Sequence, residues 1–162
     1  MEAIVPIIMG SKSDLEHAQA IGDALEKFGI PYEMRIASAH KVPALALEIL
    51  KHYEADPRQK VYITIAGRSN ALSGFTDAQV SAPVIACPPP SSSFGGADIY
   101  SSLRMPGGVA PAVVLEPGNT ALLTAKILGL SNPELKARVE SAQEANRNLL
   151  IQHDEELHRG NP

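Results

Sequence analysis

Tryptophan is absent from the 162 residues, aromatic residues make up only 4% of the chain, and there is a single cysteine, Cys87. One cysteine excludes an internal disulfide and a thiolate-rich metal site. With so few aromatic residues, the core must be built from Val, Ile, Leu and Ala. A core of that composition is typical of a buried parallel sheet covered by helices.

A strong excess of one charge and long hydrophobic runs are also lacking. The formal net charge is -4 with a pI of about 5.7. No run of Lys and Arg forms the basic face that nucleic-acid binders need. No segment approaches the roughly 18 apolar residues of a membrane span, and Met1–Val5 has no basic stretch like that of a signal peptide. We therefore expect a cytoplasmic protein without nucleic-acid or membrane partners.

The first 130 residues alternate short β-rich runs with helical patterns, which favours βαβ units. The predicted fold is α/β, a three-layer doubly wound parallel sheet of the flavodoxin-like order 2-1-3-4-5, with a long C-terminal helix. The length suits one domain spanning residues 1–162. The predicted strands are 3–9, 32–36, 60–66, 83–87 and 112–115. The predicted helices follow residues 13 and 43 and span 99–104, 119–130 and about 132–157.

Three features within these elements carry further expectations. Pro6 conflicts with a central strand, because proline cannot donate to the sheet. Ser13–Glu16 and Ser131–Glu134 have the Ser-x-x-Glu form of a capping box. The helix that begins near Pro43 has one apolar face with Val42, Leu45, Ile49 and Tyr53 and a second with Leu47 and Leu50. A helix that is apolar on two sides is usually buried on two sides, which favours oligomerisation.

Polar residues and glycines follow the first three predicted strands, in the loops 10–14, 38–41 and 67–70. Because ligands of doubly wound sheets bind at the carboxyl ends of the strands, these loops should meet at one crevice. Gly10 and Gly67 would allow tight turns and a close approach to a ligand. Ser11 and Ser13 lie at a predicted helix N-terminus, which favours phosphate.

The remaining groups in these loops complete a site for a phosphorylated small molecule. Lys41 can add countercharge, Asp14 can accept hydrogen bonds from sugar hydroxyls, and His40 supplies an imidazole, the side-chain type suited to proton transfer near neutral pH. The loop Pro88–Gly96 is expected to cover the substrate. The other four histidines are expected on the surface, and Cys87 at the end of a buried strand. Those histidines are His17, His52, His153 and His158.

Five strings in order resemble the PurE family, and within it the second class, the aminoimidazole ribonucleotide (AIR) carboxylases. They are MGSKSD (9–14), SAHK (38–41), AGRSNALSG (66–74), ACPPP (86–90) and SSLRMP (101–106). First-class members, which are mutases of the N5-carboxy ribonucleotide, usually carry arginine where this chain has Lys41 and a histidine in the third loop. The stretch Gly67–Gly74 has no histidine. The resemblance therefore implies a carboxylase that takes CO2 directly, without biotin, ATP or metal.

The resemblance also implies roles for single residues. Ser11, Ser38 and Lys41 would hold the phosphate, and Asp14 the ribose hydroxyls. Gly67 and Ser69 would face the base and the CO2 pocket, and His40 would transfer the proton. The family resemblance and the twice-apolar helix suggest an octamer with shared sites, or a tetramer, with the C-terminal helix used in oligomerisation.

Two rivals stay open at this point. One is the first-class mutase reaction. The other is a non-enzymatic flavodoxin-like module, either a phospho-receiver or an FMN carrier. A receiver needs an aspartate at the end of strand 3, where this chain has Ile65–Gly67. An FMN carrier needs loop aromatics, for which Phe94 and Tyr100 are the only candidates.

Overall fold

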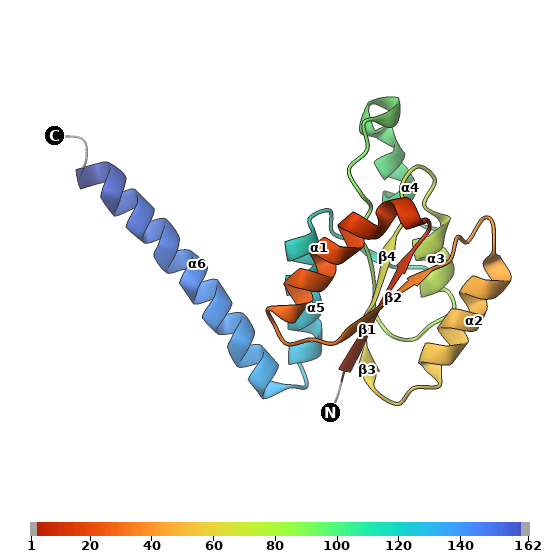
Figure 1. Ribbon diagram of the computed structural model, residues 1–162, viewed down its shortest axis with the longest axis horizontal. Helices are drawn as coiled ribbons and strands as arrows, with labels where there is room; N and C mark the ends of the chain where they lie inside the picture. The colour runs from red at the N-terminus through yellow and green to blue at the C-terminus, as the bar shows by residue number, and fades with distance from the viewer. Residues whose placement is uncertain (1–2, 160–162) are drawn as a thin grey trace.

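The computed structural model describes residues 3–159 and has a parallel sheet with helices on both sides (Figure 1). The strand order is β2-β1-β4-β5-β6, with the short β3 pairing β1. When β3 and β4 are counted as one strand, this is the predicted flavodoxin-like order 2-1-3-4-5, which is confirmed. The strands are β1 (Ala3–Met9), β2 (Tyr32–Ile36), β3 (Gln59–Lys60), β4 (Tyr62–Ile65), β5 (Val84–Ala86) and β6 (Ala112–Val113).

The helices form two layers, α1 and α5 on one face of the sheet and α2 and α3 on the other (Figure 1). The sequence pattern missed α3, because its seven residues are too few to establish a helical period and include Ser73, Gly74 and Thr76. The helices are α1 (Leu15–Glu26), α2 (Pro43–Glu54), α3 (Ala71–Asp77), α4 (Tyr100–Leu103), α5 (Pro117–Gly129) and α6 (Pro133–Arg159), with 3-10 turns η1 (Lys12–Asp14) and η2 (Ser93–Ile99).

Each face of the sheet has its own core, because side chains alternate along a strand. In β1, Val5, Ile7 and Met9 face the layer of α1 and α5, together with the first turns of α6. Ile8 faces α2 and α3 instead. All four of these side chains are buried, so β1 is covered on both faces as a central parallel strand requires.

Pro6 explains why the predicted strand 60–66 is interrupted. The register of β1 is the same against β3 and β4, since Ile4 pairs with Lys60 and Ile8 with Thr64. Gly10 donates its N–H to the carbonyl of Ile65. In the same register, four residues earlier on each strand, the nitrogen of Pro6 lies opposite the carbonyl of Val61. Because proline has no N–H, that hydrogen bond is missing and the strand breaks at Val61.

Both predicted capping boxes are wrong in the residue that caps. Ser11, not Ser13, caps the first turn, with its Oγ accepting from the N–H of Ser13 at 3.2 Å. At the start of α6, the Oδ1 of Asn132 accepts from the N–H of Leu135 at 3.1 Å, while Ser131 bonds elsewhere. Ser11 lies two positions before the predicted cap Ser13, and Asn132 lies one position after the predicted cap Ser131, so each helical turn begins at a different residue from the one the motif implies.

Only one side of α2 is buried within the chain. Ala46, Ile49, Leu50 and Tyr53 face the sheet. Of the predicted face, Ile49 and Tyr53 are buried in the single chain, whereas Val42 and Leu45 are 42% and 41% exposed.

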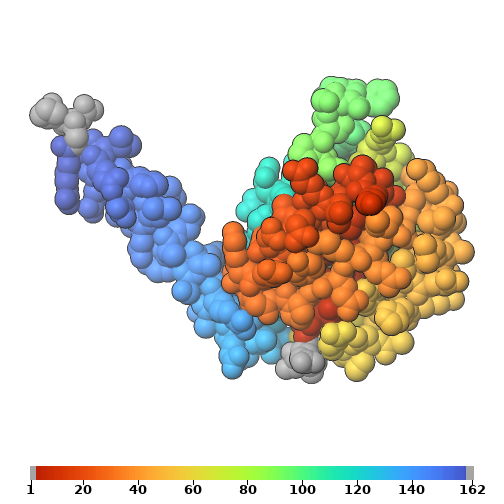
Figure 2. Space-filling model, in the orientation of Figure 1, coloured from red at the N-terminus to blue at the C-terminus, as the bar shows by residue number. Residues whose placement is uncertain are grey.

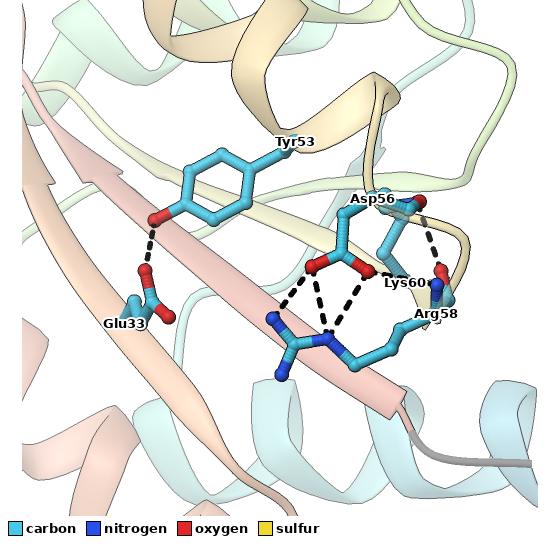
Figure 3. Close-up of polar contacts among 5 residues, drawn as sticks. All are labelled: Glu33, Tyr53, Asp56, Arg58 and Lys60. Atoms are coloured by element: carbon cyan, nitrogen blue, oxygen red, sulfur yellow. Dashed lines mark hydrogen bonds and ion pairs between the residues drawn. The ribbon is translucent and has the colours of Figure 1, made fainter.

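Charged and polar contacts fix the turn from α2 into β3, at the end of the sheet away from the carboxyl ends of the strands (Figure 3). The Arg58 guanidinium donates to the Asp56 carboxylate, with Nη2 and Oδ2 2.6 Å apart. The Lys60 ammonium donates to the carbonyls of Asp56 and Arg58, each at 2.8 Å. Tyr53 of α2 donates to Glu33 of β2 at 2.7 Å. This corner therefore ties α2 to the sheet edge.

The helix α6 leaves the body and extends into solvent (Figures 1 and 2). Only Leu135 and Val139, in its first turns, are buried. Its bounds agree with the predicted C-terminal helix at 132–157. Within residues 3–159, no helix is both long enough and apolar enough to cross a membrane.

Candidate active site

All seven sequence-predicted site residues line one cavity of about 400 Å³ at the carboxyl ends of the strands. The loops after β1, β2 and β4 contribute them, and these loops lie together near the top of Figure 1. The seven are Ser11, Asp14, Ser38, His40, Lys41, Gly67 and Ser69. The neighbouring order of β2, β1 and β4 brings the three loops to one place.

The first loop presents hydroxyls and one carboxylate. The Ser13 hydroxyl donates to Ser11 Oγ at 3.0 Å. Asp14 is half-buried, and this burial raises the pKa of its carboxyl above the ordinary value, although hydrogen bonds from Ser11 and Ser13 oppose the shift. Its carboxylate lines the cavity beside these hydroxyls.

The second loop presents the two basic side chains, His40 and Lys41, which are both exposed. The Ser38 Oγ accepts from the N–H of Lys41 at 3.3 Å, and the Ser38 carbonyl accepts from the N–H of Val42 at 2.9 Å. These two bonds close a tight turn. Pro43 then starts α2 at its first position, where the missing N–H costs nothing.

The third loop contains a residue that the sequence pattern missed. Arg68, and not Gly67, has the left-handed backbone, with φ of 57°. Asp98 accepts from the Arg68 N–H at 3.2 Å, and the Ser101 hydroxyl donates to the Arg68 carbonyl at 2.9 Å. Arg68 and Asp98 both line the cavity. No local pattern marks this conformation, because the groups that hold it lie about thirty residues further along the chain.

The segment after β5 forms the remaining wall. Pro89, Pro90, Ser91 and Ser93 line the same cavity, as expected for a substrate-covering loop. A second cavity of about 310 Å³ adjoins it and shares Gly67, Arg68 and Pro89 among its lining residues. At the tip of this segment, Phe94, Gly95 and Gly96 are all left-handed, and Phe94 is 82% exposed.

His17 is not a surface residue, so that prediction is wrong. It lies on α1, one turn after Asp14, and is half-buried against Cys87. Burial lowers the pKa of the imidazole and raises the pKa of the Cys87 thiol to about 11. Cys87 itself directly follows β5 and is buried, as predicted.

The cavity combines hydroxyls, an ammonium group, a carboxylate and an imidazole at the ligand-binding edge of a doubly wound sheet. Hydroxyl and ammonium groups beside a helical turn suit a phosphate, and an imidazole can take or give a proton near neutral pH. Among residues 3–159, no three His, Cys, Asp or Glu side chains lie together as a metal site would require. The fold and site thus define a flavodoxin-like α/β protein with a polar cavity at the carboxyl edge of its parallel sheet.

Comparison with known proteins gives the family. The family model "AIR carboxylase" matches residues 4–148. The phosphoribosylaminoimidazole carboxylase of Treponema denticola is 55% identical over 98% of this chain and 100% of its own length. That of Archaeoglobus fulgidus is 56% identical over 93% of this chain and 83% of its own. The crystal structure of Treponema denticola PurE2-S38D matches with a TM-score of 0.95 and 55% identity, covering 97% and 99% of the two chains. The chain belongs to the AIR carboxylase (PurE) family.

Proposed function

We propose that this protein is a 5-aminoimidazole ribonucleotide carboxylase of de novo purine biosynthesis that uses CO2 directly and forms 4-carboxy-5-aminoimidazole ribonucleotide. The observation that supports it most is the single cavity that seven residues from three loops line, one of which is the exposed His40. Relatives named phosphoribosylaminoimidazole carboxylase that match nearly the whole chain support the same substrate.

Two features of the sequence favour carboxylation over the first-class mutase reaction. Lys41 replaces the arginine usual in that class, and the third loop Gly67–Gly74 has no histidine. A lysine holds a phosphate as a point charge and lacks the bidentate geometry of arginine. In this proposal Ser11, Ser38 and Lys41 bind the phosphate, and Asp14 binds the ribose hydroxyls. Gly67 and Ser69 face the base and CO2.

The chemistry needs positioning and one proton transfer. The aminoimidazole ring is an electron-rich enamine, so its C4 attacks the carbon of CO2 and forms the new C–C bond. C4 is then tetrahedral, and neutral His40 removes its proton, which restores the aromatic ring and leaves a carboxylate. In the reverse direction protonated His40 returns the proton to C4. Holding CO2 beside C4 converts a bimolecular reaction into an effectively unimolecular one, which can lower the activation barrier by several kcal/mol.

The role of His40 is tested with His40→Asn. General acid–base catalysis typically contributes about 10²–10⁴-fold, so kcat should fall by at least that order while calorimetry still detects the nucleotide. His153→Asn, on the exposed part of α6, is the matched control and should keep full turnover. Near-normal turnover by His40→Asn would remove this residue from the mechanism.

The source of the carboxyl group is tested separately. With AIR as substrate, the rate should follow dissolved CO2. The N5-carboxy ribonucleotide, supplied without CO2, should not be isomerised. Direct and stoichiometric isomerisation of that compound would favour the mutase instead.

We also propose that the chain forms a homo-oligomer, an octamer or a tetramer, in which α6 takes part. The support is the apolar surface left exposed along that helix, where Leu149, Leu150 and Ile151 are each about half exposed or more. Light scattering in solution should give the mass of eight or four chains, and a monomer would contradict the proposal.

A further inference from the structure

A line of buried hydrogen bonds runs beneath the third loop. None of its four residues lines the cavity of about 400 Å³, and Ser102 lines the adjoining cavity of about 310 Å³. Ser73 Oγ lies 2.8 Å from Thr64 Oγ1 and donates to Asn70 Oδ1 at 2.9 Å. Asn70 Nδ2 donates to Ser102 Oγ at 2.9 Å. None of the four residues is more than 5% exposed. The line connects strand β4, helix α3 and helix α4.

The donors and acceptors in this line can be assigned, because the two ends of the Asn70 amide differ: Oδ1 accepts and Nδ2 donates. The Oδ1 of an amide only accepts, so the Ser73 hydroxyl gives its proton to Asn70 and must accept from Thr64. The same Oδ1 also accepts from the N–H of Ser73 at 3.1 Å, so it caps α3. The Nδ2 of Asn70 then supplies Ser102. The amide of Asn70 thus accepts through Oδ1 and donates through Nδ2, so one uncharged side chain serves both neighbours.

The third loop depends on this arrangement. Arg68 keeps its left-handed backbone through Asp98 and Ser101. The same Ser101 hydroxyl accepts from the N–H of Asn70 at 2.9 Å. A left-handed non-glycine residue persists only where its surroundings over-determine it. Asn70 therefore links the contacts that hold Arg68 to the buried hydrogen bonds. Its backbone N–H donates to Ser101, and its side chain bonds Ser102 and caps α3.

We infer that Asn70 is a positioning residue for the carboxylation, which holds Gly67–Ser69 in the geometry that faces the base and CO2. This inference rests on the proposed function. Because the phosphate would be held by the other two loops, losing Asn70 should affect turnover more than nucleotide binding.

The test compares Asn70→Ala with Ser102→Ala, which removes only the partner of Nδ2. Assays at 10 °C with saturating CO2 give kcat per folded molecule and KM for AIR. We expect kcat to fall about tenfold or more in Asn70→Ala and about threefold or more in Ser102→Ala, with KM changing less than threefold in both. If Asn70→Ala does not fold, Ser102→Ala decides.

Two controls separate positioning from stability. Thr76→Val alters a buried residue of the same helix whose hydroxyl has no partner within residues 3–159, and it should keep kcat within twofold. Leu50→Ala empties part of the α2 core and should lower Tm, but kcat per folded molecule should again stay within twofold. An unchanged kcat in Asn70→Ala, or an equal loss in Leu50→Ala, would overturn the inference.

Hydrogen exchange supplies a readout that does not depend on turnover. Compared with the unsubstituted chain, the amides of residues 68–70 should exchange at least about tenfold faster in Asn70→Ala and Ser102→Ala. Their exchange rates should be unchanged in Thr76→Val. If the unsubstituted chain does not carboxylate AIR, the proposed function fails, and this exchange comparison alone decides whether Asn70 holds the loop. Equal exchange in all variants would refute it.

Discussion

The Nε2 atom of His17 lies 3.3 Å from the Sγ atom of Cys87, seventy residues away in the chain. This contact joins the first turns of α1, just behind Asp14, to the residue that follows β5. Since Asp14 lines the cavity, the pair packs directly behind one wall of the site.

Burial lowers the pKa of His17 below its ordinary value of 6.5, which makes stability depend on pH. Below pH 6.5 the unfolded chain takes up a proton that the folded chain resists, so the free energy of unfolding should fall as the pH drops from 7.5 to 5.5. Urea titrations should show a shallower fall in His17→Gln, and an unchanged slope in His153→Gln. An equally steep fall in His17→Gln would contradict this.

Lys41 provides a test of the phosphate site. A hydrogen bond to a charged group is worth about 1.5–3 kcal/mol, so Lys41→Met should raise KM for AIR about 10- to 100-fold. Lys41→Arg keeps the charge and should stay nearer the unsubstituted value. Lys51→Met, which removes an exposed charge from α2 outside the cavity, is the matched control. Unchanged KM in Lys41→Met would place the phosphate elsewhere.

The corner in Figure 3 should govern acid stability. Hydrogen bonds from Arg58 lower the pKa of Asp56 from 3.8 to about 2. The depressed pKa contributes stability that is present above pH 3.8 and is lost as the pH falls toward 2. Asp56→Asn should therefore be less stable than the unsubstituted chain at pH 7, with the difference closing by about pH 2. Thermal unfolding across this range measures it, and Asp154→Asn on α6 should show no such convergence.

Thr76 offers a stabilising change. Its side chain is fully buried, and its Oγ1 has no hydrogen-bond partner in the described part of the chain. A buried hydroxyl without a partner costs about 1–3 kcal/mol, so the isosteric Thr76→Val should raise Tm by roughly 2–4 °C per kcal/mol gained. Calorimetry is the measurement. A lower Tm would mean that the hydroxyl does have a partner, such as a buried water.

The alternation of apolar strands and amphipathic helices was enough to predict the βαβ units and the parallel sheet, because both follow from local periodicity. The strand order came from the arrangement common to such sheets, and the meeting of the three loops followed from that order. The gap at Val61 was not predicted, because it comes from Pro6 on the neighbouring strand. For the same reason, the sequence did not predict the structural roles of Arg68, Asn70 and His17. Each depends on groups far away in the chain, namely Asp98, Ser102 and Cys87.

The helix α6 has 27 residues, and at about 1.5 Å per residue it reaches roughly 40 Å from its first turn. A fluorophore attached in place of His158 would thus report on a second chain that packs against this helix. Because the native thiol of Cys87 is buried, His158→Cys gives a single accessible attachment point without any other change to the chain.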